Sequence, residues 1–149
     1  MPRALWLILL IIALIVAAAF VLPGIAFARV GQRAVPKVTC SGNGCNNLDP
    51  EQTGCVAGAY TVQTAVLSTA ILQLRYSPTC KTNWGRVISR GSNNSDVYLV
   101  LVDRIDGLSY GTKGLVGPFA WSRMVFAPVA RARACVSING GNDICTAFV

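Results

Sequence analysis

The sequence predicts a small all-β domain, a disulfide-stabilised β-sandwich or barrel, preceded by an N-terminal signal-peptide helix. Three observations carry this prediction. Short apolar or alternating segments recur after residue 55 and are separated by Gly, Pro and Asn, which is typical of small all-β folds. All six cysteines lie between residues 40 and 145. The longest unbroken apolar run, residues 4–22, stands alone near the start of the chain.

The first 28 residues have the layout of a secretory signal peptide. Arg3 supplies the charge, residues 4–22 the apolar core, Pro23 the helix break, and small residues end at Ala28, where a signal peptidase would cut. The alternative is an uncleaved anchor, because 19 apolar residues approach the roughly 20 that span a bilayer. The break close to the cleavage motif favours cleavage, so we expect membrane contact only through the uncleaved segment.

Cleavage would leave 149 − 28 = 121 residues, with 12 basic and 6 acidic side chains and a net charge of +6. Within them we expect a flexible lead-in at residues 29–38 and the β domain at residues 39–149.

The chain has no histidine, which excludes a Ser-His-Asp site and a histidine metal ligand. The modest charge and the lack of a recognition motif argue against nucleic-acid binding. We expect no metal and no cofactor.

An even number of cysteines behind an export signal predicts disulfides, here three with fifteen possible pairings. A zinc site is disfavoured, because the chain has no histidine and no C-x-x-C pair, and because exported proteins fold under oxidising conditions. The cysteines concerned are Cys40, Cys45, Cys55, Cys80, Cys135 and Cys145.

One pairing follows from hairpin geometry. A three-residue loop at 139–141 (Asn-Gly-Gly) places position 138 opposite 142, and therefore Cys135 opposite Cys145, at a distance that a disulfide accepts. Cys40–Cys45 would close a tight local loop, and Cys55–Cys80 then follows by elimination.

The remaining elements are read in chain order. Residues 39–54 are irregular and held by cysteines, and residues 57–69 favour a strand over a short helix because they are rich in β-branched side chains. Residues 72–76 alternate with period two, and 84–89 form the next strand before a polar turn at 90–95.

The second half of the domain begins with its strongest strand. Residues 97–102 are continuously apolar, which indicates a central position or burial on both faces. Asp106-Gly107 marks a turn. Residues 115–129 are aromatic-rich but interrupted by prolines. Residues 130–136 alternate small apolar side chains with arginines, which predicts one apolar and one basic face.

Several motifs resemble the YjfA-like family, small secreted bacterial proteins that contain a domain of unknown function. They are C-x-G-x-x-C at 40–45, L-R-Y-S-P-x-C at 74–80, W-x-R at 84–86 and A-R-A-C at 132–135. The chain departs from the family pattern at Gly58, Gln73 and 122–124, and two acidic positions are lost there. The resemblance implies export and an interaction module, and it implies no reaction or ligand.

Enzymatic activity is not expected. Glycan hydrolysis needs two carboxylates roughly 5–9.5 Å apart. The candidate pairs are Asp49 with Glu51 and Asp103 with Asp106, but Asp49 and Asp106 have the context of turn residues. With the cysteines paired, no thiol nucleophile remains.

Basic and aromatic residues suggest a binding face instead, since arginines beside aromatic rings suit anions and sugars. The alternative is that the arginines brace the strands and Trp84 belongs to the core.

We expect a secreted, non-catalytic module of the extracellular space or cell wall that binds an anionic wall polymer. The alternatives are an effector or inhibitor that binds another extracellular protein through an apolar patch at Phe119, Trp121 and Phe126, and a small wall hydrolase. The candidate binding residues are Arg75, Tyr76, Trp84, Arg86, Arg131 and Arg133.

Overall fold

The structure is a computed structural model, and it describes residues 37–91, 95–115 and 117–149. The predicted signal peptide, most of the lead-in and the centre of the predicted 90–95 turn lie outside these ranges. In the part of the chain that is described, no helix combines the length and apolarity needed to cross a membrane.

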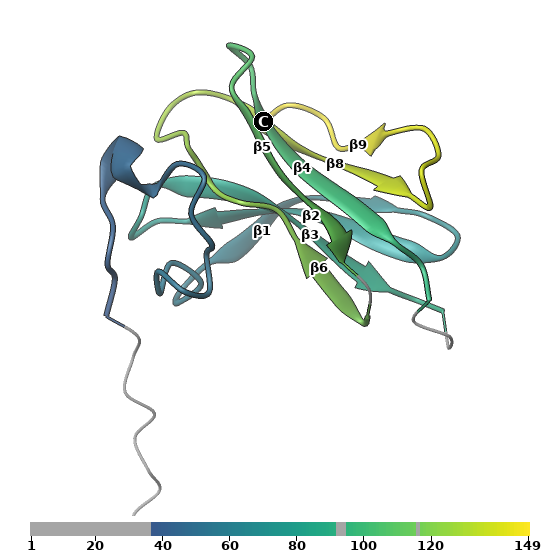
Figure 1. The fold of residues 1–149 in the computed structure, drawn as a ribbon. Helices are drawn as coiled ribbons and strands as arrows, with labels where there is room; N and C mark the ends of the chain where they lie inside the picture. The colour runs from purple at the N-terminus through teal and green to yellow at the C-terminus, as the bar shows by residue number, and fades with distance from the viewer. Residues whose placement is uncertain (1–36, 92–94, 116) are drawn as a thin grey trace, which may run out of the picture. The chain divides into compact units, whose positions relative to one another are not determined.

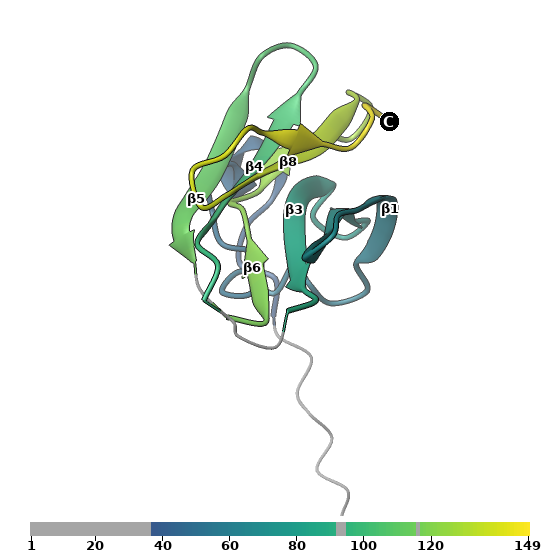
Figure 2. The ribbon, with the colours of Figure 1, turned by 90° about the vertical axis from the view of Figure 1, so that its right-hand side faces the viewer.

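Two antiparallel sheets make up the domain, which confirms the all-β prediction and selects the sandwich over the barrel (Figure 1). The first sheet has the order β1-β2-β3-β6, and β7 also pairs with β3. The second has the order β5-β4-β8-β9. Figure 2 shows the sheets as two layers. The strands are β1 (Tyr60–Val66), β2 (Ala70–Ser77), β3 (Thr82–Ser89), β4 (Tyr98–Arg104), β5 (Ser109–Leu115), β6 (Phe119–Trp121), β7 (Val125–Phe126), β8 (Ala132–Ile138) and β9 (Ile144–Cys145).

Strands β1 to β3 form a meander in which alternate side chains face the second sheet. Leu72 and Leu74 of β2 are fully buried there, as their period-two spacing predicts. The strand interpretation of residues 57–69 is confirmed, since β1 runs along β2 with a bulge between Thr61 and Gln63. β1 is the outer strand of this sheet and contributes few buried side chains.

Strand β4 lies inside the second sheet, between β5 and β8, as its apolar sequence predicts. Tyr98, Val100 and Val102 are buried against the first sheet. Leu99 and Leu101, on the other face, are only partly buried, so burial on both faces is incomplete.

The two sheets approach each other closely at Gly85 in β3. A Cβ atom at this position would lie 2.8 Å from the carbonyl oxygen of Leu101 and 2.9 Å from Cγ1 of Val100. No real side chain tolerates such distances, so only glycine allows this approach. The core on either side is filled by small and medium apolar residues, including Val87, Ala134 and Val136.

The hairpin at the end of the chain confirms the predicted pairing but corrects its loop. Cys135 pairs with Cys145 across β8 and β9. The turn has two central residues rather than three: Asn139 and Gly140 have φ angles of 53° and 75°, and the Gly141 amide donates to the Ile138 carbonyl at 2.9 Å. Positive φ at both positions matches the right-handed twist of the strands.

Candidate functional site

All six cysteines are paired, as Cys40–Cys45, Cys55–Cys80 and Cys135–Cys145, and all three predicted pairings are confirmed. Residues 37–59 are here called the disulfide segment: Cys40–Cys45 closes a loop within it, and Cys55–Cys80 ties it to the turn between β2 and β3. The segment contains one short 3₁₀ helix, η1 (Gly42–Cys45), and no strand in its described residues.

The disulfide segment packs on the outer face of the first sheet, opposite the sandwich core. Cys45, Cys55 and Cys80 are buried there with Trp84 and Met124 in a second apolar cluster. Between β6 and β7 the chain forms backbone hydrogen bonds with the disulfide segment. The Met124 amide donates to the Leu48 carbonyl (3.0 Å), and the Asn47 amide donates to the Met124 carbonyl (2.9 Å).

Asp49 fixes the turn that follows. One carboxylate oxygen accepts the Glu51 amide at 2.9 Å, and the other accepts Trp121 Nε1 at 3.3 Å and lies 3.5 Å from the Arg123 guanidinium. Asp49 therefore holds the disulfide segment against β6. The second candidate carboxylate pair is also engaged, because Asp103 binds Ser109 and Arg133, and Asp106 binds Arg104.

A cavity of about 140 Å³ lies between the disulfide segment and the first sheet. Arg75 and Trp84 are paired across β2 and β3, and Arg86 is paired with Trp121 across β3 and β6, so all four side chains share the outer face. We call this cavity the basic-aromatic pocket; the disulfide segment supplies Pro50, Glu51 and Val56 to its wall.

The two arginines are held by neutral groups. Arg75 donates to Thr61 Oγ1 (2.6 Å) and to the Ala59 carbonyl (2.7 Å). Arg86 donates twice to Gln73 Oε1, at 3.0 and 2.7 Å. Neither takes part in any ion pair between the described residues, Glu51 included. Burial lowers the pKa of Arg75 from its ordinary value, and the positive charge of Arg86 lowers that pKa further.

One family model, described as "Protein of unknown function (DUF2690)", matches residues 43–148. The chain belongs to this family. None of the curated proteins and none of the solved structures matched it. The DUF2690 match contains every residue of the basic-aromatic pocket and all the cysteines except Cys40.

The other predicted binding residues lie elsewhere in the DUF2690 domain. Tyr76 follows Arg75 in β2 and therefore faces the opposite side of the sheet, next to Asn83. Arg131 is exposed and precedes β8. Arg133 pairs with Asp103 at 3.0 Å and lies 4.7 Å from the Phe148 ring centroid. The pocket thus brings together Arg75, Trp84 and Arg86 but not the remaining three.

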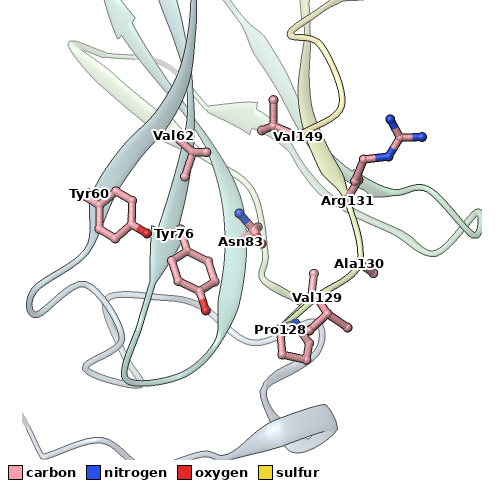
Figure 3. A pocket seen from close by; sticks show the side chains of 10 residues that line it. Tyr60, Val62, Tyr76, Asn83, Pro128, Val129, Ala130, Arg131 and Val149 are labelled. Atoms are coloured by element: carbon pink, nitrogen blue, oxygen red, sulfur yellow. The ribbon is translucent and has the colours of Figure 1, made fainter.

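Tyr76 and Arg131 line a second cavity, of about 240 Å³, at the end of the sandwich (Figure 3). Tyr60 and Tyr76 meet edge to face with ring centroids 5.7 Å apart, and Pro128 and Val129 form the facing wall. Figure 3 shows the Arg131 guanidinium pointing away from both tyrosines. This cavity offers polar and apolar surface in comparable amounts.

Four residues of the basic-aromatic pocket are not among the predicted binding residues: Pro50, Glu51, Val56 and Trp121. The sequence groups Glu51 only with Asp49, as a candidate carboxylate pair, and Trp121 only with Phe119 and Phe126, as an apolar patch. In the structure Phe119 is exposed, whereas Trp121 and Phe126 are partly buried and Trp121 packs against the disulfide cluster. No sequence signal joins Trp121 to Arg86; the β3–β6 pairing does.

Proposed function

We propose that this DUF2690 protein is a non-catalytic binding module that takes an anionic ligand in the basic-aromatic pocket. The observation that carries the proposal is the pair of partly buried guanidinium groups, Arg75 and Arg86, which repel each other and have no carboxylate partner among the described residues. A bound anion would relieve this repulsion. Because the arginines are already oriented by Thr61, Ala59 and Gln73, little side-chain entropy is lost on binding.

The pocket walls favour a sugar-containing polyanion. Trp121 provides apolar ring surface beside Arg86, whereas Trp84 is only 3% exposed and contributes little accessible surface, and Glu51 can accept hydrogen bonds from hydroxyl groups. Phosphodiester and carboxylate groups match the planar fork of arginine. The anionic polymers of a bacterial cell wall combine these features, and we propose them as the ligand class.

An extracellular location is part of the same proposal. Three disulfides are typical of proteins that fold in oxidising compartments. The signal-peptide layout of residues 1–28 and the resemblance to YjfA-like secreted proteins support export. A non-catalytic role is supported by Asp49, Asp103 and Asp106, each of which is engaged by protein groups.

Binding of the purified, oxidised protein to isolated teichoic acid tests this function. We expect Arg86→Gln to weaken binding about tenfold or more, because a hydrogen bond to a charged group contributes about 1.5–3 kcal/mol. Arg131→Gln is the matched control: it removes the same charge outside the pocket and should change affinity by less than about twofold. Equal losses in the two variants would indicate unspecific charge attraction and would overturn the proposed site.

A further inference from the structure

The four cysteines of the disulfide segment and the β2–β3 turn form a second site of different chemistry. We propose that Cys40, Cys45, Cys55 and Cys80, once reduced, bind one Zn²⁺ as a closed tetrathiolate site. Their Sγ atoms all lie within 4.8 Å of one another. Cys40 and Cys55 belong to different disulfides, yet their Sγ atoms are only 3.7 Å apart.

These distances are close to what zinc requires. A tetrahedral site with Zn–S bonds of about 2.3 Å places its sulfurs about 3.8 Å apart. Sulfurs of different disulfides are already near that spacing. Within each disulfide the two sulfurs must separate by roughly 2 Å, from the usual bond length of about 2.05 Å.

The surroundings favour a structural metal site over a catalytic one. Cys45, Cys55 and Cys80 are 0–2% exposed, and Trp84 and Met124 cover the cluster. The Met124 sulfur accepts a hydrogen bond from Thr82 at 3.2 Å. Among the described residues the group contains only thiol ligands, which select Zn²⁺ over Ca²⁺ and Mg²⁺.

The conversion balances as follows. Two molecules of a phosphine supply four electrons and become two phosphine oxides, both S–S bonds break, and two water molecules provide the oxide oxygens and the four hydrogens of the four thiols. Zn²⁺ then displaces the four thiol protons as four Zn–S bonds form. Disulfides and metal join the same stretches of backbone, so the disulfide segment stays attached to the first sheet in either state.

Cobalt provides a direct readout, since Co²⁺ in a tetrathiolate site gives intense visible bands that octahedral Co²⁺ lacks. The purified protein is reduced anaerobically with a phosphine and titrated with Co²⁺, then with Zn²⁺. We expect one Co²⁺ per chain, the tetrahedral spectrum, and stoichiometric displacement by Zn²⁺. The oxidised protein should show none of these signals.

Two variants identify the ligands. Cys55→Ser should lose the tetrathiolate spectrum, whereas the double variant Cys135→Ser/Cys145→Ser, altered in the distant hairpin, should keep it with unchanged stoichiometry. If reduction loosens the protein, tryptophan fluorescence should show metal restoring the buried environment of Trp84. No stoichiometric binding by the reduced protein, or an unchanged spectrum in Cys55→Ser, would overturn the proposal. The teichoic acid experiment uses oxidised protein, so the two tests fail independently.

Discussion

The sandwich core and the disulfide segment are stabilised by different kinds of interaction. In the core, strands β2, β3, β4 and β8 bury alternate side chains against each other, and few polar atoms enter. The disulfide segment has no strand and a small apolar cluster. Cys40–Cys45 closes a loop within it. It is attached to the sheet by the Cys55–Cys80 disulfide, by backbone hydrogen bonds with Met124, and by side-chain contacts such as Asn46 Oδ1, which accepts the Phe126 amide at 2.6 Å.

The difference shows where this fold places its potential chemistry. Successive side chains along a strand point alternately into the sandwich core and to the outer face of the sheet. On the first sheet, the outer face is covered by the disulfide segment, which contains no strand. The basic-aromatic pocket lies at that boundary: its arginines stand on rigid strands, and part of its wall comes from the disulfide segment. Changes in the core should therefore act on the whole domain, and changes in the disulfide segment should act first on the pocket.

The largest expected effect is in the core. Leu72→Ala removes a fully buried side chain between the sheets and should lower the free energy of unfolding by about 2–5 kcal/mol. Chemical denaturation of the oxidised protein measures the loss, and tryptophan fluorescence and far-UV circular dichroism should report one common transition. Separate transitions for the two probes would show that the core and the disulfide segment unfold independently.

A more local effect, with a lower upper limit, is expected for Cys55→Ser/Cys80→Ser. The disulfide spans 25 residues, so its loss should cost about 3–4 kcal/mol on the chain-entropy model. Hydrogen exchange should show faster exchange at the Asn47 and Met124 amides, which join the segment to the sheet. The matched Cys135→Ser/Cys145→Ser variant should leave those two amides protected. Unchanged protection in the first variant would mean that the apolar cluster suffices.

The smallest effect concerns an exposed ion pair outside both regions. Arg104 donates to both carboxylate oxygens of Asp106 at 2.8 and 2.7 Å, which lowers the pKa of Asp106. A lowered pKa in the folded state stabilises the fold above the ordinary Asp value of about 3.9, and this contribution is lost as pH falls through the lower folded value. Asp106→Asn should therefore melt at most a few degrees lower at neutral pH. The difference should vanish in thermal scans at strongly acidic pH, and a constant difference would contradict this origin.

Local patterns predicted what is close in sequence and missed what the sheets bring together. The Cys135–Cys145 pairing has the register predicted from the Asn-Gly-Gly loop, although the tight turn itself closes over Asn139 and Gly140 and one extra residue lies between it and β9. Arg75, Trp84 and Arg86 could be grouped because β2 and β3 are a single hairpin. Tyr76 was grouped with them by sequence adjacency, but adjacent strand residues face opposite sides.

More distant partners had no local signal. Trp121 reaches Arg86 only because β6 returns to β3 after two strands of the other sheet. Glu51 reaches the pocket because Cys55–Cys80 and Asp49 fold the disulfide segment over it. Neither contact follows from the periodicity of the sequence, since each depends on tertiary packing between segments more than 20 residues apart.

The bulge in β1 bears on self-association. β1 is an outer strand that exposes Val62 and Val66, and a flat apolar edge of this kind invites the addition of strands from other molecules. The bulge between Thr61 and Gln63 interrupts the regular hydrogen-bonding repeat that an incoming strand would need. An edge strand broken in this way is a poor template for a second molecule, even though its valines are exposed.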